Sequence, residues 1–260
     1  MTNLTILIIG FVAMVVMFAL IWLLQWKIGN AGIVDVFWAI TVGVVGVFYC
    51  VTIDGLEQRR LLVGVLITAW AARLSWHLWS RFKGHREDQR YTALKKTWGD
   101  AAQLRMLRFY QMQGLGAFLF SLAVFLCAKN SSPWSISDIV GVVVWMVAIV
   151  GEAMSDYQLY AFKQDPNNKC EVCKKGWWRY SRHPNYFFEV LHWCSYVFLA
   201  FGTSFWWLAF LMPAAMYHFL TNVTGIPLSE KQSIKSRGEK YRQYQQTTNA
   251  FFPWFPKDDG

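Results

Sequence analysis

The densest group of residues able to do chemistry is the run 178–186, which reads WRYSRHPNY and is followed by Glu189. Proline fits the first turn of a helix, so Pro184 predicts that a helix begins there. The free backbone N–H groups of a helix start attract phosphate, and arginine binds phosphate through two parallel hydrogen bonds. The run therefore predicts an anion site, with Asn185 and Glu189 one turn apart on one helix face. Its cationic members are Arg179, Arg182 and His183.

A second basic run, 81–91, reads RFKGHREDQRY and includes Arg81, Arg90 and Tyr91. For any single arginine, the simpler explanation is the excess of positive charge that cytoplasmic loops of membrane proteins carry. A cluster of arginines interleaved with tyrosine and asparagine is more specific for an anionic ligand. The two runs together therefore predict a loop-built site for phosphate groups.

Charged residues within apolar stretches also predict function, because a charge at the bilayer centre costs roughly 2.5–3.5 kcal/mol. Asp35 has two interpretations: an acid stabilised by the dipole at a helix start, or a carboxylate that faces the interior and orients a substrate. Arg73 and His77 share one face of the next predicted helix. Glu152 and Asp156 share a face of a later helix and need a basic partner or hydroxyl donors, which a ribose or an amide would supply.

No metal site is expected. Cys170 and Cys173 form a lone CxxC pair, whereas a zinc site needs four ligands and no second pair follows. His183 could add only a third ligand. His192 and His218 lie in predicted helices, where packed and hydrogen-bonded side chains are the favoured interpretation.

The elements that position these residues are predicted from composition. The 260 residues are 55% hydrophobic and only 16% charged, which is too apolar for an ordinary soluble domain. A membrane-spanning helix needs about 20 apolar residues, and uncharged stretches of that length alternate with charged loops. We therefore predict an all-α, polytopic membrane protein with a single domain, 1–260. The predicted helices are 4–26, 31–51, 60–80, 112–128, 137–163, 185–201 and 204–222, followed by a cytoplasmic tail, 223–260.

Lysine and arginine are concentrated in the loops after the third and fifth predicted helices and in the tail. Because such charge accumulates on the cytoplasmic side, we expect the N-terminus outside and the C-terminus in the cytoplasm. The membrane would be the inner membrane if the source is bacterial. Topology accounts for most of the net charge of +9, so nucleic acid is not an expected partner.

The run 178–189, together with Asp156 upstream, resembles the steroid 5-alpha-reductase family, most closely its bacterial branch. The combination of Asn185 and Glu189 with Asp156 carries most of this resemblance. The Arg-His-Pro core is less specific, since it also resembles membrane sterol reductases and isoprenylcysteine carboxyl methyltransferases. Other segments that fit are 34–38 (VDVFW), 70–74 (WAARL), 87–91 (EDQRY) and 238–244 (GEKYRQY).

This resemblance implies a seven-helix fold that holds NADPH in a cytoplasm-facing cavity. It also implies reduction of the 4,5 double bond of 3-oxo-4-ene steroids or similar lipid enones, with hydride passing to the beta carbon while the carbonyl is polarised. The catalytic residues carried over by position are Asp35, Glu189 and Trp70. Those assigned to the cofactor are Arg73, Arg81, Arg90, Tyr91, Glu152, Asp156, Lys163, Arg179, Arg182, His183, Asn185 and Tyr241.

The chain departs from this family at the group that polarises the carbonyl. Family members use a Glu in the second helix and a Tyr in the third, whereas this chain has Asp35 and Trp70 at the matching positions. The donor could be protonated Asp35, the Trp70 N–H or another tyrosine.

Two other functions are considered: a membrane methyltransferase using S-adenosylmethionine, and a non-catalytic protein for lipid binding or transport. The 2′-phosphate of NADPH needs more cationic groups than S-adenosylmethionine does, so the arginine-rich loops favour the reductase. The expected partners are an apolar small-molecule substrate from the bilayer and membrane lipids, and the protein is expected to be a monomer.

Overall fold

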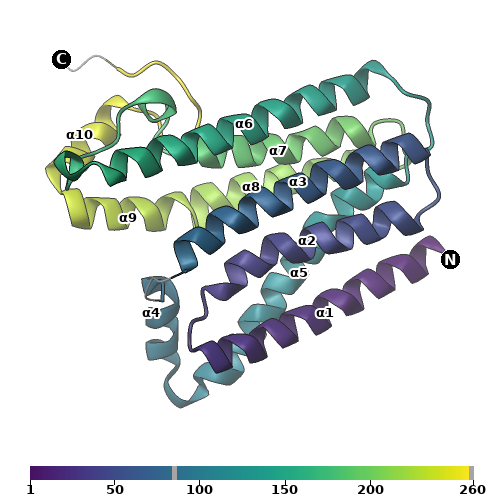
Figure 1. The fold of residues 1–260 in the computed structure, drawn as a ribbon, viewed down its shortest axis with the longest axis horizontal. Helices are drawn as coiled ribbons and strands as arrows, with labels where there is room; N and C mark the ends of the chain where they lie inside the picture. The colour runs from purple at the N-terminus through teal and green to yellow at the C-terminus, as the bar shows by residue number, and fades with distance from the viewer. Residues whose placement is uncertain (84–86, 258–260) are drawn as a thin grey trace. The chain divides into compact units, whose positions relative to one another are not determined.

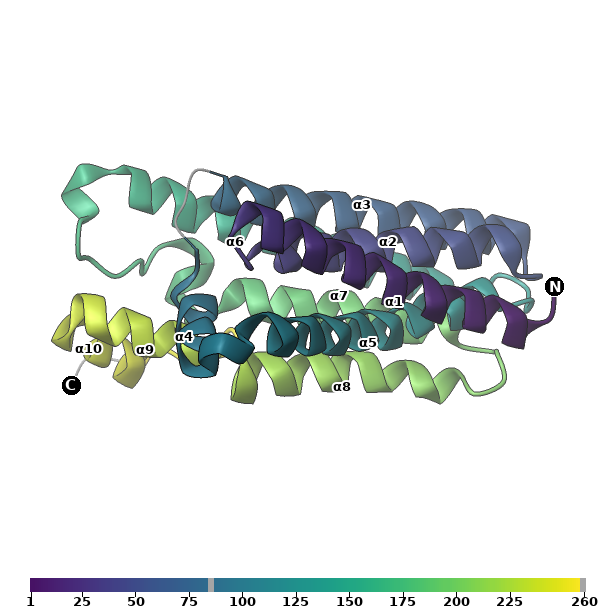
Figure 2. The same ribbon diagram turned by 90° about the horizontal axis from the view of Figure 1, so that it is seen from below.

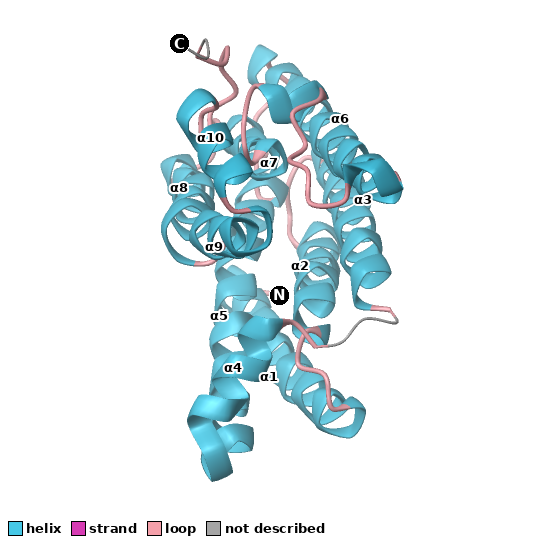
Figure 3. Ribbon diagram, turned by 90° about the vertical axis from the view of Figure 1, so that its left-hand side faces the viewer, coloured by secondary structure: helices cyan, strands magenta, loops and turns pink. Residues whose placement is uncertain are grey.

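All regular secondary structure in the computed structural model, which describes residues 1–83 and 87–257, is helical, and these residues contain no β-strand (Figure 3). Among them, five helices are long and apolar enough to cross a membrane: Asn3–Ile28, Ile33–Thr52, Glu57–Phe82, Arg90–Ala128 and Ile136–Gln164. The predictions of an all-α fold and of several membrane-spanning helices are confirmed.

The chain forms two units, residues 1–133 with 200–206 and residues 134–199 with 207–260. In the first unit α2 packs against α1, α3 and α5 (Figures 1 and 2). A side chain at Gly43 would place its Cβ 2.6 Å from the Cβ of Ala71, so glycine is what allows α2 and α3 to approach. The helices of this unit are α1 (Asn3–Ile28), α2 (Ile33–Thr52), α3 (Glu57–Phe82), α4 (Gln89–Trp98) and α5 (Ala102–Ala128).

Arg59 has a structural role that its position near a predicted loop did not indicate. The helix α3 begins at Glu57, three residues before the predicted start, so Arg59 lies inside it and is 1% exposed. Its guanidinium donates to the backbone carbonyls of Asn130 and Ser132, both at 2.8 Å, and to that of Pro133 at 3.3 Å. Arg59 thereby supplies donors to three carbonyls that follow the end of α5, of which that of Asn130 also accepts from the backbone N–H of Leu56 at 3.3 Å.

The second unit begins with α6, whose start is fixed by a capping box between Ser135 and Asp138. The chain then passes through two short 3₁₀ turns, Pro166–Asn168 and Gly176–Arg179, before α7 begins at Pro184, one residue before the predicted range 185–201. The helices of this unit are α6 (Ile136–Gln164), α7 (Pro184–Ala200), α8 (Leu211–His218), α9 (Ile226–Arg237) and α10 (Glu239–Thr247).

Two further predicted helices differ from those observed. The helix predicted over 112–128 starts at Ala102, because its polar first turns pack on α1: Trp22 Nε1 donates to the carbonyl of Gln103 at 3.1 Å, and Gln25 Nε2 to its side chain at 2.9 Å. The helix predicted over 204–222 is divided into a 3₁₀ segment (206–210), α8 and a π-helical turn (219–223). The predicted tail contains α9 and α10.

Candidate functional site

In the first unit, α2 and α4 bring an acid and a phenol together. The hydroxyl of Tyr91 donates to Asp35 Oδ1 at 2.7 Å, and Arg90 Nη2 lies 3.2 Å from Asp35 Oδ2. Arg90 also pairs with Asp88 at 3.0 Å. The side chain of Asp35 is 35% exposed, whereas Tyr91 is 3% exposed. The hydrogen bond to Tyr91 and the ion pair with Arg90 therefore account for Asp35 better than the helix dipole at the start of α2 does.

The position of Tyr91 is fixed by contacts between α4 and the turn that joins α1 to α2. Glu87 Oε1 accepts hydrogen bonds from the backbone N–H of Ala31 and from Lys95 Nζ, both at 2.6 Å. Lys95 also donates to the carbonyl of Gly29 at 3.1 Å, and the Tyr110 hydroxyl donates to that of Ala31 at 2.8 Å. These contacts hold the first turn of α4, and with it Tyr91, against the start of α2.

The remaining predicted residues of the first unit lie on α3. Trp70 is completely buried and packs edge-to-face on Trp38, with ring centroids 6.2 Å apart. Arg73 is half-buried, and Arg81 is exposed in the last turn. Trp70 thus has a clear packing role, while the cofactor roles of Arg73 and Arg81 stay predictions. Of the run 81–91, residues 84–86, which include Arg86, lie outside the described residues.

In the second unit, α6 and α7 bring together the acids and the amide that the sequence singled out. These are Glu152, Asp156, Asn185 and Glu189, called here the α6–α7 cluster. Asn185 Nδ2 donates to Asp156 Oδ1 at 3.3 Å. Glu189 accepts from Trp193 Nε1 at 2.9 Å and is 7% exposed, and Glu152 is 4% exposed. The Oδ1 atom of Asn185 is buried and accepts no hydrogen bond from any residue that the structure describes.

Close packing places this α6–α7 cluster. Gly151 precedes Glu152, and a Cβ at Gly151 would lie 2.4 Å from the ring of Phe188, the residue before Glu189. Only a glycine at position 151 therefore lets the part of α6 that carries Glu152 approach the part of α7 that carries Glu189. One turn on, Trp178 Nε1 donates to the carbonyl of Ser155 at 2.9 Å and joins the segment before α7 to α6.

Arg182 and His183, predicted to bind a cofactor, are engaged by the tail. Arg182 Nε lies 2.7 Å from Glu230 Oε1, and His183 Nε2 lies 3.2 Å from the same oxygen. Gln245 Nε2 donates to the other oxygen at 2.7 Å, and the Tyr241 hydroxyl lies 3.5 Å from Oε1. Arg182 also donates to the carbonyls of Gln245 and Thr248. These residues form a clamp, called here the Glu230 clamp, between the start of α7 and α9–α10.

The charges of the Glu230 clamp are set by burial and by its hydrogen bonds. Burial alone would raise the pKa of Glu230, but the hydrogen bonds from His183 and Arg182 lower this pKa to about 2. Burial lowers the pKa of His183 despite the neighbouring carboxylate, so His183 is neutral near pH 7 and donates from Nε2. Burial also raises the pKa of the Tyr241 phenol.

Two predicted cofactor residues, Lys163 and Arg179, are exposed, the first in the last turn of α6 and the second in the turn before α7. Cys170 is exposed and Cys173 is buried, both as free thiols, and burial raises the pKa of the Cys173 thiol. In residues 1–83 and 87–257, no three His, Cys, Asp or Glu side chains are grouped so as to hold a metal ion.

Sequence reasoning missed two acids that organise these sites, Glu87 and Glu230. Glu87 was noted only as part of a matching segment, and Glu230 lies in a charged tail that looked solvated. A weak signal for Glu230 existed: it ends the segment IPLSE (226–230), whose proline favours a helix start, and it is the one acid in 226–238, which also holds Lys231, Lys235 and Arg237.

The apolar helices and the buried acids on them define a multi-pass membrane protein. The chain belongs to the family described as "Protein of unknown function (DUF1295)", whose model matches residues 21–248. The search of curated proteins and the search of solved structures gave no match.

Proposed function

We propose that the protein is an NADPH-dependent reductase of lipid enones, acting on the 4,5 double bond of 3-oxo-4-ene steroids or of similar apolar substrates. The observation that carries this function is the α6–α7 cluster, in which the buried Asn185 Oδ1 accepts no hydrogen bond within the described chain. A buried acceptor without a donor costs about 1–3 kcal/mol, so a ligand that donates to it gains affinity.

The α6–α7 cluster fits the neutral, donor-rich part of NADPH. The carboxamide and the ribose hydroxyls of that cofactor donate hydrogen bonds, and Asn185, Asp156 and Glu189 offer acceptor oxygens. These acids would repel a phosphate, which instead suits the exposed Lys163 and Arg179. Arg182 and His183 contribute by holding the tail against α7 through Glu230.

Bound NADPH would supply the hydride for the reduction. Negative charge then develops on the substrate carbonyl oxygen, and a positioned donor stabilises it, an effect typically worth about a hundredfold or more in rate. We assign this role to Tyr91, whose hydroxyl is bound to Asp35. Tyr91 thus takes the place of the tyrosine that the family has where this chain has Trp70. Tyr91 has a single hydroxyl proton, so it can donate to the carbonyl oxygen only when Asp35 carries a proton and donates to the phenol oxygen instead; Asp35 thereby orients Tyr91.

We further propose that seven segments cross the membrane, with the N-terminus outside and the C-terminal tail in the cytoplasm. The tail and the loop before α7 then lie in one compartment, as their mutual contacts through Glu230 require. NADPH is available in the cytoplasm, and the apolar substrate reaches the protein from the bilayer.

The test is thermal stabilisation of the purified protein by nucleotides, with turnover of a 3-oxo-4-ene steroid measured in parallel. NADPH should stabilise more than NADH, and high salt should weaken the difference because phosphate contacts are screened. Asn185→Ala should lose most of the stabilisation, whereas the exposed Asn167→Ala should keep it. Stabilisation by S-adenosylmethionine alone would instead support the methyltransferase function.

A further inference from the structure

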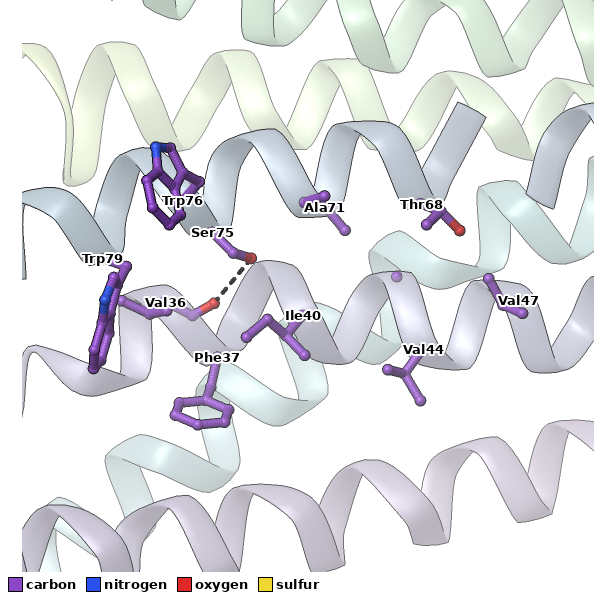
Figure 4. A pocket seen from close by; sticks show the side chains of 12 residues that line it. Val36, Phe37, Ile40, Val44, Val47, Thr68, Ala71, Ser75, Trp76 and Trp79 are labelled. Carbon is purple, nitrogen blue, oxygen red and sulfur yellow. Dashed lines mark hydrogen bonds between the residues drawn. The ribbon is translucent and has the colours of Figure 1, made fainter. Parts of the chain in front are cut away.

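An apolar groove of about 730 Å³ runs along the first unit between α2 and α3 (Figure 4). This volume is in the range of about 300–1,000 Å³ found for ligand pockets. The groove is distinct from the pair Asp35–Tyr91, since neither residue lines it. The lining residues are Val36, Phe37, Ile40, Gly43, Val44, Val47, Thr68, Ala71, Ala72, Ser75, Trp76 and Trp79.

Small residues form the floor of the groove, and large ones stand at one end. Gly43 and Ala71 are buried where the two helices meet, while Ala72 is exposed. Trp76 and Trp79 are 74% and 42% exposed and mark the end near the C-terminus of α3 (Figure 4). The groove therefore exists because small side chains leave a channel along both helices.

The wall of the groove offers hydrocarbon and no free hydroxyl. The Ser75 hydroxyl donates to the carbonyl of Val36 at 3.4 Å, and the Thr68 hydroxyl donates to that of Gly64 at 2.7 Å. Both hydroxyls are thus used by helix carbonyls. An occupant gains from burying apolar surface, and apart from the indole N–H groups of Trp76 and Trp79 at one end the lining side chains offer it no polar group that is not already bonded, which favours a hydrocarbon chain.

The length of the groove matches one leaflet of a bilayer. Its lining extends over twelve residues, and so eleven steps, on each helix, from Val36 to Val47 and from Thr68 to Trp79. At 1.5 Å per residue this is about 16 Å. Half of the roughly 30 Å hydrocarbon core of a bilayer is about the same.

The tryptophan end of the groove has the chemistry of a headgroup region. Tryptophan concentrates at the membrane–water interface, where Trp76 and Trp79 would lie. The two cations that follow, Arg81 and Lys83, are both exposed. A chain buried in the groove would therefore place its headgroup beside positive charge.

We propose that this groove binds one acyl chain of an anionic glycerophospholipid from the leaflet at the C-terminal end of α3, with its phosphate beside Arg81 and Lys83. The groove is independent of the reductase function, because none of its lining residues is assigned to NADPH or the enone; Arg81 alone is predicted for both sites.

The first test is lipid retention, measured by mass spectrometry of protein purified from mixed phosphatidylglycerol and phosphatidylcholine vesicles without NADPH. Ala72→Phe fills the groove from an exposed position and should lower retained phosphatidylglycerol about tenfold, equivalent to about 1.4 kcal/mol. Ala69→Phe makes the same change at an exposed position of α3 outside the groove and should retain lipid like the wild type. Arg81→Gln should reduce the preference for phosphatidylglycerol over phosphatidylcholine.

A second test needs no variant. Phosphatidylglycerol with a photoreactive group in one acyl chain should label α2 and α3 within 36–47 and 68–79, and excess unlabelled phosphatidylglycerol should compete. Labelling spread evenly over the exposed helices, or equal retention by Ala72→Phe and Ala69→Phe, would overturn the proposal.

Discussion

Replacing Glu230 by glutamine should destabilise the protein by about 3 kcal/mol. Its carboxylate accepts from Arg182 at 2.7 Å, from His183 at 3.2 Å and from Gln245 at 2.7 Å, and its side chain is 13% exposed. These contacts lower the pKa of Glu230 from its ordinary 4.5 to about 2. A difference of about 2.5 in pKa corresponds to about 3 kcal/mol at 1.36 kcal/mol for each step. Glutamine removes this charge and leaves Arg182 without its counter-ion, a change of similar cost.

The assay is thermal unfolding in detergent, where a loss of about 3 kcal/mol should lower the Tm by roughly 6–12 °C. The matched control is Glu239→Gln, since Glu239 is 66% exposed and lies 3.7 Å from an equally exposed Arg242. Exposed pairs of this kind contribute about 0–1 kcal/mol, so the control should melt close to the wild type.

The pH dependence gives an independent measure of the same contact. Because the pKa of Glu230 is lower in the folded state, its stabilisation is present above pH 4.5 and is lost as the pH falls towards 2. Glu230→Gln should lack this part of the acid transition. If Glu230→Gln melts within about 2 °C of Glu239→Gln, or keeps the full acid transition, the clamp does not stabilise the tail.

Three further changes test the first unit, the α6–α7 contact and the carbonyl donor. Tyr91→Phe should lower turnover about a hundredfold with NADPH-induced stabilisation intact, and normal turnover, as expected for the exposed Tyr160→Phe, would exclude Tyr91 as the donor. Arg59→Met leaves the carbonyls of Ser132 and Pro133 without their donor and should cost several kcal/mol at about 1–3 kcal/mol each. A Tm like that of the exposed Arg105→Met would contradict the capping role. Gly151→Ala should destabilise the protein by about 1–3 kcal/mol through overpacking against Phe188, although alanine usually favours a helix. Adding Phe188→Leu to this variant should restore much of the lost stability. A double variant that is no more stable than Gly151→Ala would show that the strain lies elsewhere.

The long apolar helices could be predicted because their signal is local. The bounds of α1, α2 and α6 differ from the prediction by at most two residues at each end. The early start of α5 could not be predicted from local pattern, since Gln103 is polar and becomes helical where it contacts Trp22 and Gln25 of α1. That contact joins residues about eighty positions apart, which no local window contains.

The sequence identified the candidate residues by their chemical type, but it did not show which residues they contact. Asp35 and Tyr91 were both singled out, in separate roles, and the hydrogen bond between them joins α2 to α4 across 56 positions. The resemblance assigned Asp156 and Asn185 to the cofactor without predicting a contact, and the two side chains are hydrogen-bonded at 3.3 Å. Glu230 was missed because an acid in a charged tail has the appearance of a solvated residue. Only the fold shows that Arg182 lies against it.

These partners change how the basic residues of the two loops are understood. A cation can bind an incoming phosphate at full strength only if its charge is not already neutralised by a neighbouring carboxylate. Arg90 is paired with Asp35 and Asp88, and Arg182 is paired with Glu230. Arg179 is exposed, near the α6–α7 cluster in sequence and in the same unit. The Arg-His-Pro core therefore orders the start of α7, which carries Asn185 and Glu189, and the choice of NADPH over NADH should depend on Arg179.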